Sequence, residues 1–182
     1  MKKYACFTGH RDFSRFHTSL SSAEHAIAHL VEIAIQQHEI SHFYSGMAIG
    51  TDLLAARVLC KLGLPWTAVI PCENQPNKWS KNWQKAYFSL LAQANSSIVL
   101  QSEYSRSCMN ARNAWMVKRS DLLIAVWDEQ KTKGSGTFNT VQMAMKKKIP
   151  LLLWNPSTLK VKNLKPKPKI QLSVQLNLNL TL

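Results

Sequence analysis

The sequence predicts an α/β fold, a doubly wound, mostly parallel sheet of about six strands with helices on both faces. Short apolar runs of strand length alternate with longer segments whose apolar residues recur at helical spacing, which is typical of strands joined by crossover helices. Loops rich in Gly, Ser, Thr and Arg follow the strands, whereas the connections into the next strand are short. Because the carboxyl ends of parallel strands meet at one edge of a sheet, we expect a binding site at that edge.

In the first half of the chain, three predicted strands alternate with two helices. The first helix begins near Ser21 and Glu24, which fit a capping box, and apolar residues follow at helical spacing. Gly63 and Pro65 form a stop signal for the second helix. The predicted strands cover residues 4–8, 42–45 and 66–70, and the second helix covers residues 53–62.

The second half continues the same alternation. A third helix is predicted from an apolar stripe that includes Trp83, Tyr87 and Leu91, which favours a core position for Tyr87. The last helix starts around Thr137 and closes with three lysines, which are favourable at the C-terminal end of a helix dipole. The predicted strands cover residues 97–100, 122–127 and 151–154, and a fourth helix contains residues 112–119.

Length and composition limit the classes of protein to which the chain can belong. The 182 residues, 46% of them hydrophobic, suffice for one domain with a core, and the net charge of +13 attracts nucleotides, nucleic acid and anionic surfaces alike. We expect a cytoplasmic protein, because no apolar stretch is long enough to cross a bilayer and the first residues lack a signal peptide's apolar core. The four cysteines form no CxxC pair, and His25 and His29 lack a third ligand nearby, so we predict no metal site, disulfide framework or cofactor.

The C-terminal segment differs from the rest, so we divide the chain into a domain over residues 1–156 and a segment over residues 157–182. The segment begins as a linker rich in Lys and Pro. Residues 170–182 then alternate apolar and polar side chains with the period of a strand that has one buried face. This end either pairs with the edge of a sheet, in this chain or in a partner, or is a flexible tail.

Two loops at the predicted edge carry glycines immediately before a helix. In SGMAIGTD, glycines permit positive φ and let backbone N–H groups approach an anion, although such loops often need Gly for geometry alone. GSGTFNT repeats the arrangement and adds side-chain donors. A third turn, TGHR, follows the first strand. Three such turns favour a phosphate or ribose-phosphate site, and the candidate binding residues are Thr8, Gly9, His10, Arg11, Ser45, Gly46, Ala48, Gly50, Thr51, Asp52, Gly134, Ser135, Gly136, Thr137, Asn139 and Thr140.

Further candidates lie outside these turns. Arg112 presents a planar donor fork that suits a phosphate or a carboxylate, or else forms a surface ion pair. Asn113 could bind a ribose hydroxyl or a base edge, or cap the helix. Trp79, with Glu73 and Gln75 in the preceding loop, could frame a base by stacking and edge contacts, although aromatic residues at this spacing more often belong to the core.

These motifs together resemble the SLOG superfamily of Rossmann-like nucleotide-binding proteins, in its YpsA-like branch. The resemblance covers nearly all of residues 4–156 through FTGHR, SGMAIGTDLLAA, PCENQPNKW, CMNARNAWMVKRSDLLIAVWD and GTFNTVQMA. It implies a doubly wound sheet and a ligand pocket lined by these loops. Dimers or higher homo-oligomers are common in this superfamily, and sheet-edge pairing and helix packing both permit them here.

A related branch, the Lonely Guy phosphoribohydrolases, cleaves the N-glycosidic bond of nucleoside monophosphates with an arginine and a glutamate. The resemblance places the arginine on Arg112, but the glutamate position falls on Thr140, which has no carboxylate to activate water. Whether the chain is an enzyme is therefore left open. The acids that could substitute are Asp52, Glu73, Asp128 and Glu129.

Three functions follow in order of preference. The first is binding of a phosphorylated nucleotide-type small molecule, such as an ADP-ribose-like or NAD-derived compound, by a sensor, carrier or sequestering protein. The second is hydrolysis of a glycosidic or phosphate bond in such a molecule. The third, less favoured, is nucleic-acid binding, which the positive charge and the DNA-processing branch of the same superfamily support. No membrane partner is expected.

Overall fold

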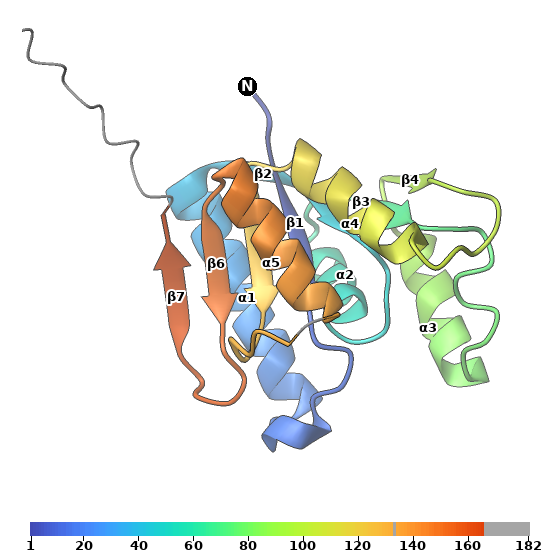
Figure 1. The fold of residues 1–182 in the computed structure, drawn as a ribbon, viewed down its shortest axis with the longest axis horizontal. Helices are drawn as coiled ribbons and strands as arrows, with labels where there is room; N and C mark the ends of the chain where they lie inside the picture. The colour runs from blue at the N-terminus through green and yellow to red at the C-terminus, as the bar shows by residue number, and fades with distance from the viewer. Residues whose placement is uncertain (133, 166–182) are drawn as a thin grey trace, which may run out of the picture.

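A computed structural model describes residues 1–132 and 134–165 of the chain, and within them the predicted α/β fold is confirmed. Seven strands form one sheet in the order β4-β3-β2-β1-β5-β6-β7, with β1 at its centre (Figure 1). All neighbouring pairs are parallel except β6 and β7. The strands are β1 (Lys3–Gly9), β2 (Ile40–Ser45), β3 (Trp66–Ile70), β4 (Ser96–Val99), β5 (Leu122–Val126), β6 (Leu151–Trp154) and β7 (Val161–Leu164).

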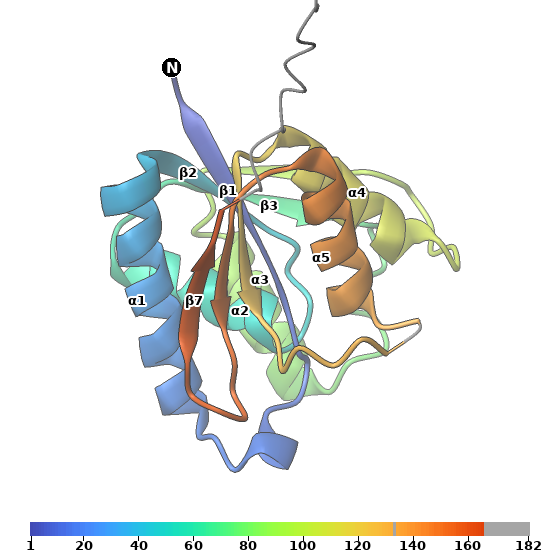
Figure 2. The same ribbon diagram turned by 60° about the vertical axis from the view of Figure 1, so that its left-hand side comes forward.

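Five α-helices cover both faces of the sheet, as the alternating pattern predicts. One face carries α1 to α3, and the other carries α4 and α5, which pack side by side (Figure 2). A short 3-10 helix, η1 (Ser14–Phe16), precedes α1. The helices are α1 (Leu20–His38), α2 (Thr51–Lys61), α3 (Lys81–Leu91), α4 (Cys108–Arg119) and α5 (Gly136–Lys147).

The start of α1 differs from the prediction. The N-cap is Ser19, whose side chain accepts a hydrogen bond from Ser22 N at 3.0 Å. The predicted capping box of Ser21 and Glu24 is therefore wrong: Ser21 already lies inside the helix, and Glu24 instead accepts a hydrogen bond from Lys61 of α2 at 2.6 Å. Three serines, Ser19, Ser21 and Ser22, stand before the apolar stripe, and local sequence does not choose among them as caps.

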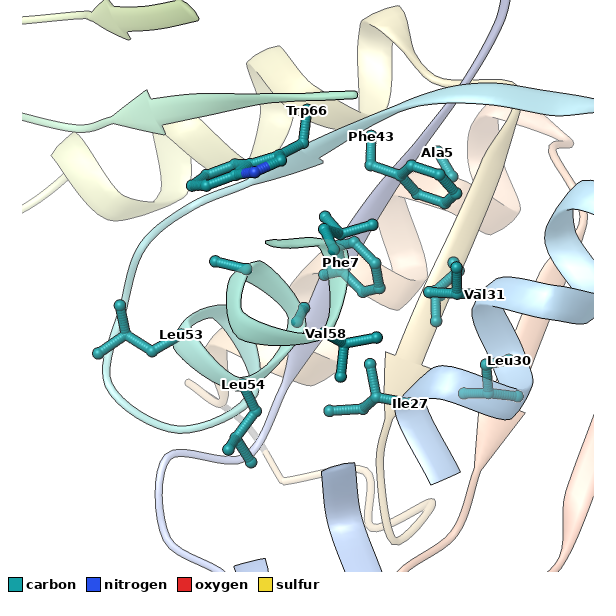
Figure 3. Packing of buried hydrophobic residues seen from close by; sticks show 14 of the residues in the cluster. Ala5, Phe7, Ile27, Leu30, Val31, Phe43, Leu53, Leu54, Val58 and Trp66 are labelled. Carbon is teal, nitrogen blue, oxygen red and sulfur yellow. The ribbon is translucent and has the colours of Figure 1, made fainter. Parts of the chain in front are cut away.

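Side chains of alternate strand residues enter the two cores, one on each face of the sheet. On β1, Phe7 packs against Phe43 of β2, with ring centroids 6.0 Å apart, in the core beneath α1 and α2 (Figure 3). Ile27 of α1 and Val58 of α2 meet in the same cluster. Cys6, the neighbour of Phe7, faces the other core under α4 and α5. The same clusters confirm the core position of Tyr87, which is 2% exposed.

The strand β7 was not predicted, because its residues lie in the segment that was expected to be a linker rich in Lys and Pro. Its four residues pair antiparallel with β6, with Trp154 opposite Val161 and Leu151 opposite Leu164. Lys162 of β7 also donates from its Nζ to both carboxylate oxygens of Glu129, each at 2.7 Å. The sheet thus extends past residue 156, while the alternating segment 170–182 lies outside the described residues.

The strand order places a crevice beside β1. The chain proceeds from β1 through β2, β3 and β4 on one side, then crosses to β5, which pairs with the other side of β1. The loops that leave β1 and β5 therefore diverge to opposite sides, and the carboxyl edge between them is the usual ligand position of open α/β sheets. In the part of the chain that the structure describes, no helix has the length and apolar character needed to cross a membrane.

Candidate functional site

A cavity of about 340 Å³, which we call the central cavity, opens at this carboxyl edge. Residues from two of the three predicted turns form one side of it. The end of β1 and the turn after it contribute all four candidates of that motif, and the loop between β2 and α2 with the start of α2 contributes two. These residues are Thr8, Gly9, His10, Arg11, Ala48 and Asp52.

The opposite side of the central cavity is formed by the first turns of α4 and α5. Arg112 and Asn113 enter from α4, and the glycine turn before α5 contributes its two glycines and Thr137. Four lining residues were not predicted: Phe7, Ile49, Met109 and Asn110. Met109 and Asn110 stand three residues before Arg112 and Asn113, so helical spacing could have placed them on the same face.

Arg112 is the most buried cation of the site, with 3% of its surface exposed. Its Nη1 lies 3.5 Å from Asp52 Oδ2 and also donates to the carbonyl oxygen of Gly46, while its Nε donates to Asn113 Oδ1 at 2.8 Å. Burial raises the pKa of the Asp52 carboxyl, and the Arg112 charge acts against that shift. Arg112 keeps its charge, because a guanidinium is not deprotonated in proteins.

The glycine loop before α2 is shaped by this ion pair. A Cβ on Gly46 would meet the Arg112 guanidinium and lie 2.7 Å from Asp52 Oδ2, so the position requires glycine. Ala48 N donates to Asp52 Oδ2 at 3.3 Å, and Met47 N donates to Ser45 Oγ at 3.2 Å. The backbone N–H groups of Met47 and Ala48 therefore stabilise the loop itself. The cationic groups that line the cavity are the arginine side chains.

The remaining candidates of this loop brace it against the turn after β1. Gly50 adopts φ 90°, and a Cβ there would lie 2.6 Å from the carbonyl oxygen of Arg11. The hydroxyl and the backbone N–H of Thr51 both donate to the carbonyl oxygen of His10 at 3.0 Å. These contacts fix the positions of His10 and Arg11 at the wall of the central cavity.

The candidates from GSGTFNT divide between the cavity and the helix that follows it. Ser135 is the N-cap of α5, and its hydroxyl accepts from Phe138 N at 3.3 Å. Thr140 is fully buried; its hydroxyl donates to the Gly136 carbonyl at 2.7 Å and accepts from Asn113 Nδ2 at 2.9 Å. Asn139 is outside the cavity lining. Thr140 therefore orients Asn113, which in turn holds the Arg112 guanidinium.

His10 belongs to a charged cluster at the rim of the central cavity. Its Nε2 lies 3.1 Å from Asp128 Oδ1, and its Nδ1 lies 3.1 Å from Arg15 Nη2, which also donates to Asp128 Oδ2 at 3.0 Å. The backbone N–H of Asp128 also donates to Nε2 at 3.2 Å. Burial lowers the pKa of the His10 imidazole, and the nearby Asp128 carboxylate acts against that shift.

Two predicted base-binding residues lie in a neighbouring cavity of about 460 Å³, which we call the side cavity. It is formed by the loop after β3 and the segment before α4, and it shares Met109 with the central cavity. Glu73 is exposed and lines neither cavity. The lining residues are Asn74, Gln75, Asn77, Lys78, Trp79, Tyr104 and Met109.

The four acids considered as substitutes for the missing glutamate take different positions. Asp52 lines the central cavity. Asp128 is held by His10 and Arg15, and Glu129 is held by Lys162 and Asn155. Among residues 1–132 and 134–165, no three His, Cys, Asp or Glu side chains are grouped closely enough to hold a metal ion.

The fold and the cavity at its carboxyl edge define a Rossmann-like α/β protein of the SLOG type. The profile of the YpsA family, described as the YspA SLOG family, matches residues 5–156, and the chain belongs to this family. The resemblance that the motifs indicated is thereby confirmed. A comparison with curated proteins found no match.

Solved structures with the same fold include proteins of different function. DNA processing protein A from Streptococcus pneumoniae has a TM-score of 0.58 and 19% identity, over 84% of this chain and 50% of that one. DNA processing protein A from Helicobacter pylori, whose structure is described with its single-stranded DNA binding mode, has a TM-score of 0.57 and 22% identity. The match covers 83% of this chain and 64% of that one.

A third similar structure is the molybdenum cofactor carrier protein from Chlamydomonas reinhardtii, with a TM-score of 0.51 and 19% identity, over 84% of this chain and 76% of that one. The chain thus spans 50% and 64% of the two DNA processing proteins. Identities this low show the shared fold, and the function has to be argued from the site.

Proposed function

We propose that the protein binds a phosphorylated nucleotide-type small molecule, such as an ADP-ribose-like or NAD-derived compound, in the central cavity. The observation that carries the proposal is the convergence of Arg11, Arg112 and the first turns of α4 and α5 on that cavity. Helix N-termini carry partial positive charge and unpaired N–H groups, and guanidinium groups match phosphate oxygens in geometry. The lining contains two arginines and one carboxylate, Asp52, so its net charge is positive.

A role as a sensor, carrier or sequestering protein fits the site better than fast catalysis. Thr140 occupies the position at which the related phosphoribohydrolases have their glutamate, and its hydroxyl is already bonded to Gly136 and Asn113. A buried threonine cannot stabilise positive charge that develops on a ribose ring. The lining therefore supplies groups that hold an anion, without the carboxylate of the related enzymes at its usual place.

Calorimetric titration with ADP-ribose, NAD, cyclic ADP-ribose and AMP tests this function. Arg11 is exposed, so Arg11→Gln should leave the fold intact and weaken binding about tenfold, as expected for a lost charge-assisted hydrogen bond. Arg119→Gln is the matched control, because Arg119 is an exposed arginine that stacks over Trp115 and lines neither cavity. A folded sample that binds no member of the panel would refute the proposal.

Hydrolysis of the N-glycosidic bond of such a ligand is a second candidate, favoured by the position of Asp52. Of the four acids considered, Asp52 is the one that lines the central cavity, and burial raises its pKa as is common for catalytic carboxyl groups. It would activate a water that attacks the anomeric carbon while the C–N bond breaks and the base leaves with a proton.

Chromatographic detection of the released base separates this candidate from binding alone. Turnover that Asp52→Asn abolishes would establish it, whereas ligands that bind and remain intact over long incubation exclude it for those ligands. The net charge of +13 makes single-stranded DNA a necessary competitor in both assays. If a mononucleotide displaces the DNA from the protein, the DNA binds in the central cavity. If only salt releases the DNA, its binding is a non-specific effect of the positive net charge.

A further inference from the structure

The side cavity has the features of a subsite for a planar, hydrogen-bonding group. Two aromatic residues, Trp79 and Tyr104, line it together with amide side chains and Lys78. Tyr104 is 62% exposed, and Trp79 is held in place by an edge contact with Tyr87, with ring centroids 5.5 Å apart. Aromatic faces stack on heterocyclic bases, and amides read the donors and acceptors at a base edge.

Gln75 supplies an independent observation in the same place. The residue is 6% exposed, and its side-chain oxygen Oε1 is buried without a hydrogen-bond partner among the described residues. The orientation of the amide is fixed, because Nε2 donates to the carbonyl oxygen of Gly46 at 3.3 Å and Oε1 in that position would face another acceptor. An unpaired buried acceptor costs about 1–3 kcal/mol, which a donor supplied by a ligand would recover.

Gln75 also connects the two cavities. The Gly46 carbonyl that accepts from Gln75 accepts from Arg112 as well, so the group at the edge of the side cavity and the cation of the central cavity share one acceptor. Met109 lines both cavities. The two cavities are therefore adjacent, with Met109 between them.

We propose that the side cavity is the base subsite of a nucleotide whose phosphate lies in the central cavity. The proposal depends on the proposed nucleotide-binding function and specifies it: the base stacks on Trp79 and Tyr104, and an N–H of its edge donates to Gln75 Oε1. Oε1 is covered in the ligand-free chain, so binding includes movement of a covering side chain. Met109, which lines both cavities, is unbranched and changes its side-chain conformation readily.

Calorimetry with ribose 5-phosphate and the four nucleotides AMP, GMP, CMP and UMP tests the subsite. The wild-type chain should bind at least one of the nucleotides about tenfold more tightly than ribose 5-phosphate, a difference of about 1.4 kcal/mol. Gln75→Met preserves the length of the side chain. It removes the unpaired acceptor together with the hydrogen bond from Nε2 to the Gly46 carbonyl, so the net cost to the fold should be small. In this variant the preference for the nucleotide over ribose 5-phosphate should fall to roughly threefold or less.

Tyr104→Ala provides a second variant that does not disturb the core, since Tyr104 is largely exposed. It should reduce the same preference, and Phe88→Ala, another exposed aromatic residue that lines neither cavity, should not. Equal affinity for ribose 5-phosphate and all four nucleotides, or a preference that survives both Gln75→Met and Tyr104→Ala, would overturn the base subsite and leave the phosphate site standing. Failure of all five compounds to bind would overturn the proposed function itself, and this inference with it.

Discussion

Asp52 and Arg112 form a buried ion pair, with Arg112 Nη1 3.5 Å from Asp52 Oδ2, that joins the first turn of α2 to α4 across the carboxyl edge of the sheet. Both residues line the central cavity, so the pair is a structural brace and part of the binding surface at once. A buried pair is costly to break on one side, because the remaining charge is left without compensation.

Replacing Asp52 with Asn should lower stability and raise anion affinity. The substitution leaves Arg112 buried without its counter-ion, for which we expect a loss of about 3 kcal/mol in urea denaturation. Removal of the only acidic group among the cavity-lining residues should tighten the binding of ribose 5-phosphate about tenfold, as measured by calorimetry. Glu32→Gln removes an exposed carboxylate on α1 and is the control for net charge. Weaker binding by Asp52→Asn would contradict this account of the cavity.

Two glycines with similar positive φ values should differ in their tolerance of alanine. Gly50 and Gly134 have φ values of 90° and 84°, so Ala at either position carries the strain of a positive φ, about 1–2 kcal/mol. Gly50 also has a ψ of −127°, outside the left-handed helical region that other residues can enter. A Cβ at Gly134 meets nothing within 4 Å, whereas a Cβ at Gly50 lies 2.6 Å from the carbonyl oxygen of Arg11. Gly50→Ala should therefore lose roughly 3 kcal/mol or more in urea denaturation.

The difference between these two variants reports the close approach of Gly50 to the turn after β1 together with the unusual ψ of Gly50. Because that approach positions Arg11, Gly50→Ala should also weaken ribose 5-phosphate binding in the fraction that stays folded. Equal losses of stability in the two variants would show that the positive φ alone requires glycine at residue 50.

Much of the fold follows from periodicity that the sequence displays. Each of the six predicted strands and five predicted helices exists, with ends displaced by a few residues, because apolar spacing reports which face of an element is buried. The strand β7 was missed for a physical reason. Its residues Val-Lys-Asn-Leu are mostly exposed, and their pairing is determined by the neighbouring β6 rather than by their own pattern.

The candidate site was predictable where it depends on sheet topology and not where it depends on distant contacts. Loops that follow parallel strands share an edge, which is why residues as far apart as His10, Asp52 and Arg112 could be expected to converge. The ion pair between Asp52 and Arg112, and the separation of Gln75 and Trp79 into a second cavity, depend on side-chain packing between elements that local sequence does not report.

The cap of α1 offers a direct test of a position that local pattern misassigned. Ser19→Ala removes the hydroxyl that accepts from Ser22 N and should lower the free energy of unfolding by about 1 kcal/mol. Ser21→Ala lies two residues further on, inside the helix and exposed, and should change stability by about 0.5 kcal/mol or less. Thermal denaturation of the two variants compares them directly. A larger loss for Ser21→Ala would restore the capping box that the sequence suggested.

Three histidines should make the folded state sensitive to acid. Burial lowers the pKa of His10, His38 and His42 from the ordinary value of 6.5, so each imidazole stays neutral in the folded state at pH values where it is already protonated in the unfolded state. Between the lowered pKa and 6.5 the unfolded state binds more protons. The free energy of unfolding therefore falls as the pH is lowered through this window, by at most about 1.4 kcal/mol per pH unit for each group.

His42 is the most informative of the three to replace, because its Nε2 lies 2.8 Å from Thr67 Oγ1 on the sheet and outside both cavities. His42→Gln retains a hydrogen-bonding side chain but cannot titrate, so the loss of stability between pH 7.5 and 5.5, measured by urea denaturation, should be smaller than in the wild-type chain. The same substitution at His29, an exposed residue of α1, controls for the loss of an imidazole. An unchanged pH dependence in His42→Gln would show that the native contacts of His42 do not oppose its protonation.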